Sequence, residues 1–291
     1  SNTLASLHYL FLVPGALGVI PLLFCNEEQL KSYRNIIFLP WLSLLTFFML
    51  VVWLSLEDLI CLIILGAPFF ALVTIVAFIV RLVLIYRQRH KDKLLSILLL
   101  PFLAAPLENM LNSPISENRV ETMITIEAPP HLVWEKIIRV DEISPDEYKS
   151  GLFNQLGIPR PISATLNEEK RGGVRTGHFW GGLKFTEVIT VWQPHREVAF
   201  TIAVDNATIG KQIFQRHVLG GNYFKFLNAR YRLKENQDGS TSLVLTSGYR
   251  LTSKVNFYGK FWGDWMLKDF QKRLLAVIKA RCERFSNIDS K

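Results

Sequence analysis

Three long apolar runs in the first third of the chain constrain its fold more than any other feature. No charged residue occurs in residues 4–25, 36–56 or 59–80. Each run matches the roughly 20 residues that a helix needs to cross a bilayer core of about 30 Å. A cleaved signal peptide is the alternative for the first run, but its apolar stretch is unusually long and no basic region precedes it. The sequence therefore predicts a transmembrane helical domain over residues 1–111.

The orientation of this domain depends on a fourth apolar segment, 94–111, which fits either a short span or a helix lying in the membrane interface. Basic residues cluster just after the third run, at Arg81, Arg87, Arg89, Lys91 and Lys93. The positive-inside rule places that end in the cytoplasm. If the fourth segment crosses the membrane, the rest of the chain is extracytoplasmic, and otherwise it is cytoplasmic. Acidic residues after the segment favour the extracytoplasmic side.

Charge and cysteine content limit the partners of the remaining chain. The formal net charge is +8, most of it after Ser113, which favours contact with anionic lipid headgroups. Nucleic acid is the other partner that a basic domain suggests, but the sequence has no recognised binding motif, so we expect no nucleic-acid partner. Three cysteines, two of them in apolar runs, give no disulfide framework.

The pattern after residue 111 predicts an α+β domain. A polar linker is expected at 112–118, and a domain at 119–291. An alternating strand over 120–127 precedes a short amphipathic helix over 131–140. Strands are expected at about 174–180, 183–192, 197–204, 229–235 and 241–252, followed by a long amphipathic helix over about 256–285. This order suggests a curved antiparallel sheet around a C-terminal helix.

The opening of this domain, VETMITIEAPPHLVWEKIIRV at 120–140, resembles the START-like (SRPBCC) helix-grip superfamily. That superfamily includes polyketide cyclases, Bet v 1-like allergens and lipid-transfer domains. The segments FTEVITVWQP (185–194) and EVAFTI (197–202) and the closing helix add to the resemblance, which covers roughly 120–285. The membrane helices make the chain look like a membrane-anchored bacterial subset, and so predict a multi-pass protein of the bacterial inner (plasma) membrane. The resemblance implies a deep apolar cavity between sheet and helix.

No sequence motif identifies an enzyme, a cofactor site or a metal site. There is no nucleophile elbow, phosphate loop, dinucleotide fingerprint or zinc-binding spacing. We therefore expect no cofactor and no metal. Glu187 and His217 are the weak catalytic candidates. Alternation would put Glu187 on one strand face with Ile189 and Val191, so it is either solvated or paired with a residue such as Arg175 or His178. The candidate ligand-binding residues are Arg160, Arg175, His178, Phe179, Glu187, His217, Tyr223, Trp262, Trp265 and Met266.

Three functions fit these observations. The favoured one is membrane-tethered binding or transfer of a lipid or other hydrophobic ligand in the cavity. The second is a cyclase, dehydratase or hydrolase acting on a hydrophobic substrate, with Glu187 or His217 as general base. The third is a ligand-sensing interaction module with a membrane-protein partner. The expected partners are accordingly membrane lipids or a hydrophobic small molecule.

Overall fold

The structure is a computed structural model that describes residues 7–87, 113–210 and 215–289. The chain forms two compact units, Ser1–Pro114 and Ile115–Lys291. The segment 94–111, the expected fourth span, lies outside the described residues. The choice between the two sides of the membrane, which depends on that segment, lies outside them too.

Helices α1 (Leu7–Leu23), α3 (Tyr33–Trp53) and α4 (Leu59–Arg87) pack against one another in the N-terminal unit. The short helix α2 (Glu27–Lys31) lies between α1 and α3 in the chain and begins with a capping box formed by Asn26 and Gln29. Small clusters of apolar side chains are buried between the helices, but other large apolar side chains of α3 and α4 are exposed. Helices that are apolar all round are typical of a membrane environment.

Two described helices, rather than the three or four expected, are long and apolar enough to cross a membrane: Tyr33–Trp53 and Leu59–Ile85. The apolar part of α1, Phe11–Leu23, is shorter. The 17 described residues of α1 span about 26 Å at 1.5 Å per residue, less than a bilayer core of about 30 Å. Among the described residues, the first apolar run, expected as a span over 4–25, forms only the shorter helix Leu7–Leu23 and does not count as a third span.

One antiparallel sheet of seven strands forms the C-terminal unit, in the order β1-β7-β6-β5-β4-β3-β2. The strands are β1 (Ile115–Ile126), β2 (Pro161–Leu166), β3 (Val174–Phe179), β4 (Lys184–Gln193), β5 (Glu197–Val204), β6 (Phe224–Glu235) and β7 (Thr241–Thr252). Side chains alternate between the two faces of each strand. On β7, for example, Leu243, Leu245, Tyr249 and Leu251 are all buried on one face.

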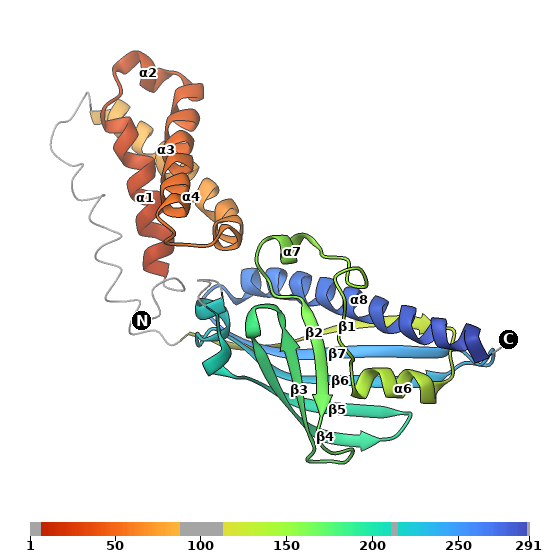
Figure 1. Cartoon of the computed structure of the whole chain (residues 1–291). Coiled ribbons are helices and arrows are strands. Elements are labelled where there is room, and N and C mark those ends of the chain that lie inside the picture. The colour runs from red at the N-terminus through yellow and green to blue at the C-terminus, as the bar shows by residue number, and fades with distance from the viewer. Residues whose placement is uncertain (1–6, 88–112, 211–214, 290–291) are drawn as a thin grey trace. The chain divides into compact units, whose positions relative to one another are not determined.

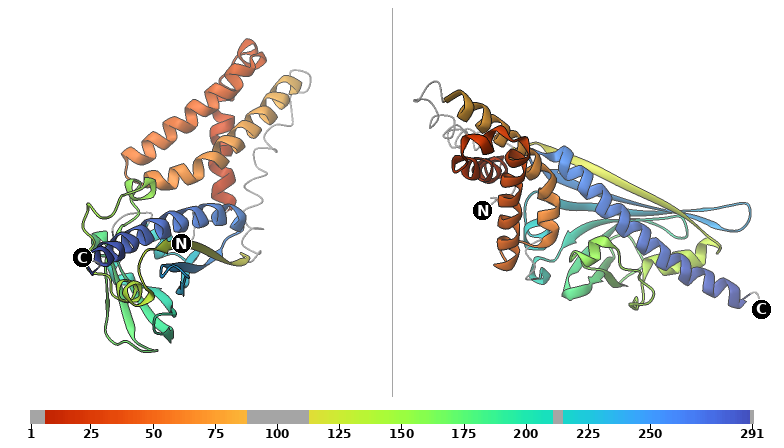
Figure 2. Two further views of the ribbon diagram at one scale, coloured as in Figure 1. Left: turned by 90° about the vertical axis from the view of Figure 1, so that its right-hand side faces the viewer. Right: turned by 90° about the horizontal axis from the view of Figure 1, so that it is seen from above.

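The long helix α8 (Asn256–Asp289) lies along this buried face, as Figure 1 shows. The two further views in Figure 2 also show the helix lying over the sheet. Gln271 of α8 is fully buried and binds β1 and β7: it donates to Val120 O and to Ser247 Oγ and accepts from Thr122 Oγ1. An antiparallel sheet that grips one long C-terminal helix is the expected helix-grip architecture.

Helix α6 (Pro130–Ile138) packs beside the C-terminal half of α8. Proline at its first position fits the helix start, because the missing N–H has no partner there in any case. Val133, Trp134, Ile137 and Ile138 are buried on the side that faces the core. Four shorter helices, α7 (Leu152–Gln155), η1 (Trp180–Gly182), η2 (Asn206–Thr208) and η3 (Gln215–Leu219), lie in the connections.

Several elements differ from the sequence expectation, such as β6, which begins at Phe224 rather than at about 229. β1 begins at Ile115, inside the range 112–118 expected as a linker, and it pairs with β7 from that residue onward. β2 was not expected as a strand because Pro159 and Pro161 looked like a break. Proline is tolerated as the first residue of a strand, and Pro161 takes that position in β2.

Candidate functional site

A cavity of about 180 Å³ lies between the sheet and α8. The strands β2 to β7, the helix η3 and residues Gly263 to Leu274 of α8 contribute its walls. The lining is mainly apolar and includes six phenylalanines, Phe179, Phe185, Phe200, Phe224, Phe226 and Phe270. An apolar cavity of roughly 150 Å³ stays dry and admits a molecule of benzene size. The cavity therefore suits an apolar group.

Among the polar residues of this wall, Arg175, Glu187 and Tyr231 on β3, β4 and β6 form one cluster. Arg175 and Glu187 are directly opposite in the β3–β4 register, and Nη1 of Arg175 forms an ion pair with Oε2 of Glu187. The two residues are only 6% and 9% exposed. A buried charge needs both a partner and hydrogen bonds, so this pair depends on each of its contacts.

The C-terminal end of α6 holds the guanidinium of Arg175 in place. Nε donates to Ile138 O at 3.1 Å and Nη2 donates to Ile137 O at 3.3 Å. The carbonyls at the end of a helix carry partial negative charge, which stabilises a cation there. The Phe200 ring lies 5.4 Å from Cζ of Arg175. Burial disfavours the charge, but Glu187 and Tyr231 outweigh that effect and raise the pKa of Arg175.

Glu187 and Tyr231 each keep a polar atom available to the cavity. Oε2 of Glu187 accepts from Arg175, whereas Oε1 accepts no hydrogen bond from a described residue. The Tyr231 hydroxyl also makes no hydrogen bond with a described residue, and burial raises its pKa to about 12. The phenol is therefore protonated at neutral pH and can donate. A carboxylate acceptor and a phenol donor together suit a ligand that carries a hydroxyl or similar group.

Gly177 leaves room in front of this carboxylate. It lies on β3 between Arg175 and Phe179, on the same face of the strand. A Cβ atom at this position would lie 3.4 Å from Cε2 of Phe179 and 3.5 Å from Oε1 of Glu187. These are ordinary van der Waals distances, so a larger side chain at position 177 would extend into the cavity.

The structure places four of the sequence-predicted site residues in the cavity wall: Arg175, Phe179, Glu187 and Met266. The other six do not line it: Arg160, His178, His217, Tyr223, Trp262 and Trp265. His178 alternates with Arg175 along β3 and faces the opposite side of the sheet. His217 belongs to η3, whose next two residues, Val218 and Leu219, reach the cavity.

Sequence reasoning missed Tyr231 as a site residue. Alternation along the end of β6 puts Tyr231 and Leu233 on the buried face, with Arg230 and Arg232 on the other. The sequence alternation already indicated that Tyr231 and Leu233 share a face. Nothing in the sequence showed that β6 lies two strands away from Glu187. Ser163, Gln215 and Ser247 also line the cavity and were missed.

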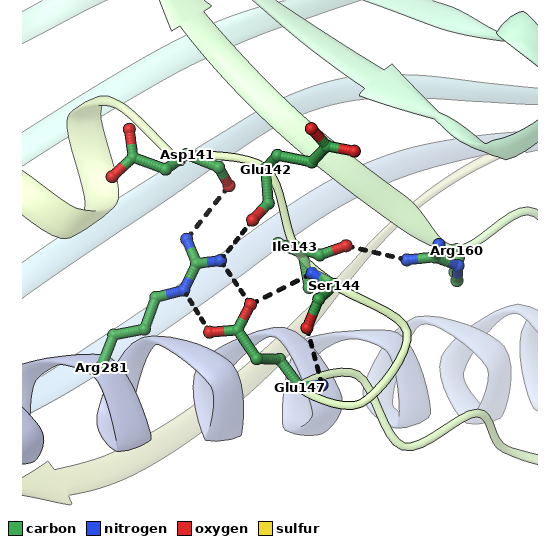
Figure 3. Close-up of polar contacts among 7 residues, drawn as sticks. All are labelled: Asp141, Glu142, Ile143, Ser144, Glu147, Arg160 and Arg281. Carbon is green, nitrogen blue, oxygen red and sulfur yellow. Dashed lines mark hydrogen bonds and ion pairs between the residues drawn. The ribbon is translucent and has the colours of Figure 1, made fainter.

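A second arginine–glutamate pair braces the loop that follows α6 (Figure 3). Arg281 of α8 donates to both carboxylate oxygens of Glu147, and to the carbonyls of Asp141 and Glu142. The hydrogen bond from Arg281 is the largest of the causes that lower the pKa of Glu147 to about 2. We call this group of contacts the Arg281 clamp.

Arg160 binds the same loop. Its Nη1 donates to Ile143 O at 3.1 Å, and its Cζ lies 5.3 Å from the centre of the Trp180 ring. Ile143 lines the cavity, so Arg160 supports one of its walls next to the Arg281 clamp. Arg160, a candidate ligand-binding residue, thus has a structural contact in this unit. Among the described residues, no group of three His, Cys, Asp or Glu side chains could hold a metal ion.

No protein-family model matches the sequence, and neither does any curated protein. Several solved structures are similar to it. The Zhui aromatase/cyclase from Streptomyces sp. R1128 is 19% identical, with a TM-score of 0.37 over 58% of this chain and 95% of that one. A protein from Chromobacterium violaceum is 13% identical, with a TM-score of 0.37 over 57% of this chain and 97% of that one. A protein from Nitrosospira multiformis is 15% identical, with a TM-score of 0.37 over 58% and 99%.

Proposed function

We propose that this chain is a membrane-tethered protein whose C-terminal unit binds or transfers a lipid or other hydrophobic ligand, one that also carries a hydroxyl-like group. The observation that carries the proposal is the apolar cavity with one polar cluster in its wall. The apolar lining favours an apolar ligand, while Oε1 of Glu187 and the hydroxyl of Tyr231 favour a polar group on it. A site of this kind derives affinity from apolar contact and specificity from a few polar atoms.

The tether in this proposal consists of α3 and α4. Both are long and apolar enough to cross a membrane, and α4 ends in the basic segment that contains Arg81 and Arg87. Basic residues next to a span favour the cytoplasmic side, which suits a bacterial inner membrane. A tether keeps the cavity close to a supply of apolar ligand and so raises its effective concentration there. We also propose that the C-terminal unit belongs to the START-like superfamily, which its sequence resembles.

Photocrosslinking from inside the cavity tests this function in the full chain. A benzophenone amino acid replaces Phe270, which lines the cavity, or Val188, whose side chain is exposed and on the other face of β4. After irradiation of native membranes, mass spectrometry should find one discrete small molecule joined to position 270 and absent from position 188. The same mixture of bulk phospholipid at both positions would contradict a selective cavity.

A reaction at the same site is the second candidate, because Oε1 of Glu187 is free of protein partners among the described residues and lines the cavity. A carboxylate in that position can serve as a general base. The variant Glu187→Gln removes the base but keeps the shape of the side chain. A retained molecule of the same mass in the wild type and the variant supports carriage, whereas an accumulated precursor of different mass in the variant supports catalysis.

A further inference from the structure

Exposed aromatic residues form a stripe along the first three turns of α8. Phe257, Phe261 and Trp265 are 80%, 58% and 45% exposed. Their spacing of four residues puts them on one face of the helix. We call these three residues the aromatic stripe. Large apolar side chains that share an exposed surface mark an interaction site more often than single ones do.

The stripe lies at one end of the C-terminal unit, which we call the Ile115 end. The strand register brings together at this end Ile115 and Thr252, Pro161 and Phe179, His178 and Lys184, and Phe185 and Val204. Helix α8 starts four residues after Thr252, and its C-terminus lies at the opposite end of the sheet (Figure 1). The first turns of α8 therefore belong to the Ile115 end.

Other exposed apolar side chains extend the stripe at the Ile115 end. Trp265 packs edge-on against Phe153 of α7, and the preceding residue, Leu152, is exposed. Trp180 follows β3 in η1 and is also exposed. Leu152 and Trp180 thus add exposed apolar side chains from α7 and η1 to the same end of the unit.

The cavity reaches the same end of the unit. Ile158 and Pro159 precede β2, and Leu183 joins η1 to β4. Val218 and Leu219 belong to η3, which precedes β6, and all five residues line the cavity. Ile158, which follows α7, and Leu183, which follows η1, therefore join elements that carry exposed apolar side chains to the cavity wall.

The chain and its charges also favour a membrane at the Ile115 end. β1 begins there, and the chain that precedes it leads back to α4, a helix apolar enough to cross a bilayer. Lys184 and Lys225, near the starts of β4 and β6, are exposed and make no ion pair with a described residue. Aromatic residues favour the headgroup level of a bilayer, and lysines add attraction to anionic lipids.

We propose that the aromatic stripe, with Leu152 and Trp180, inserts into the interface of an anionic phospholipid bilayer and so opens the Ile115 end of the cavity directly onto lipid. This inference rests on the proposed function for the reason why the unit would dock on a bilayer. The positions of the exposed residues support it independently. Insertion of a few aromatic residues alone gives weak and reversible binding, and the covalent link to α4 makes such weak contact sufficient.

Depth-dependent fluorescence quenching on the full chain tests the docking. The background carries Cys25→Ala, Cys61→Ala and Cys282→Ala, and circular dichroism confirms that it is folded. A single cysteine labelled with NBD then replaces Phe261, or Gln237 in the β6–β7 turn as the matched control at the opposite end. Proteoliposomes of equal parts phosphatidylcholine and phosphatidylglycerol carry nitroxide-labelled lipids. Phe257→Cys provides a second position if Phe261→Cys does not fold.

The label at position 261 should emit at shorter wavelength and be quenched several-fold more strongly than the label at position 237. Equal quenching at the two positions would overturn the proposal. A blue shift at 261 without lipid quenching would overturn it too, because protein rather than lipid would then cover the stripe. Ligand retention by the cavity is measured separately by crosslinking at position 270, so docking and ligand binding succeed or fail independently.

Discussion

The C-terminal unit contains two arginine–glutamate pairs that use the same chemistry in different ways. In the Arg281 clamp, both oxygens of Glu147 accept from Arg281, and Oε2 accepts also from the Ser144 N–H. In the cavity pair, Arg175 contacts only Oε2 of Glu187. The clamp thus satisfies its carboxylate from within the protein, whereas the cavity pair leaves one oxygen without a described partner.

The difference distinguishes a structural ion pair from one that can also bind a ligand. Clamp residues join α8 to a loop, and their side chains are partly exposed to water. Residues of the cavity pair are buried in an apolar wall, where an unsatisfied polar atom is costly. A ligand that hydrogen-bonds to Glu187 would lower that cost. We therefore expect the stability of the protein to depend on both pairs. Ligand retention should depend on the cavity pair alone.

The largest effect is expected from Glu187→Leu, which leaves the charge of Arg175 buried without its partner. Breaking a buried pair on one side costs about 3–5 kcal/mol of unfolding free energy. The control is the double variant Arg175→Met/Glu187→Leu, which removes both charges and should recover most of that loss. Denaturant unfolding in detergent, followed by near-UV circular dichroism, measures both. If the single variant were as stable as the double one, the pair would not be buried as described.

Arg281→Met should have a smaller effect on stability and none on ligand retention. The variant loses charge-assisted hydrogen bonds to Glu147 and to two carbonyls, but water can replace part of them because the site is partly exposed. The expected loss is about 2 kcal/mol. Loss of the copurified ligand in a variant that is still folded would contradict this prediction, because it would show that the clamp also shapes the cavity.

Acid should remove the contribution of the clamp within a defined pH window. The folded-state pKa of Glu147 is lowered from about 4.5 to about 2. Its ionised form is therefore favoured by folding, so the stabilisation is complete above about pH 5 and decreases as the pH falls toward 2. The wild type should lose stability over this window by more than Glu147→Gln, in which the group cannot titrate. Parallel pH profiles for the two proteins would contradict the lowered pKa.

Tyr231→Phe isolates the hydrogen bond to the ligand. The hydroxyl makes no hydrogen bond with a described residue, so the unfolding free energy should change by less than about 1 kcal/mol. One lost hydrogen bond to the ligand corresponds to about a 3- to 10-fold weaker affinity. The half-life of the retained ligand during detergent exchange should shorten by that factor. An unchanged half-life would place the polar group of the ligand elsewhere.

The smallest effect is expected from an exposed pair on the other face of the sheet. Arg250 forms an ion pair with Glu117, and both side chains are largely in water. Such pairs contribute about 0–1 kcal/mol. Arg250→Gln should therefore leave both unfolding and ligand retention within that range. A larger loss would mean that the sheet face is covered in the folded protein.

The sequence predicted strand limits correctly where the alternation of apolar and polar residues and the turn residues indicate the same limits. β5 and β7 have the expected bounds, and α8 starts at the expected residue, Asn256. The sheet order could not be derived, because alternation shows which face a residue occupies but not which strand is adjacent. For the same reason the sequence offered Arg175 and His178 equally as partners of Glu187. Only the register of β3 against β4 selects Arg175.

The membrane part was overestimated for a different physical reason. Uncharged length is a property of the sequence, but crossing a bilayer needs a continuous helix of that length. Residues 4–25 contain no charge, yet the described part of this run is helical only over Leu7–Leu23. The aromatic residues of α8 illustrate a related limit. Trp262 and Trp265 were candidate ligand-binding residues because they lie on the closing helix, but Trp265 is 45% exposed and neither residue lines the cavity.

Native mass spectrometry of the full chain, released from mild detergent, tests the central claim most directly. Wild type is compared with Gly177→Leu, which places a side chain in front of Glu187 and fills part of the cavity. We expect a discrete added mass on the wild type, identified by extraction as an apolar molecule with a hydroxyl-like group. Gly177→Leu should lose this added mass at unchanged stability. A wild type without added mass, or the same bulk lipid on both proteins, would contradict the claim that this cavity binds a ligand.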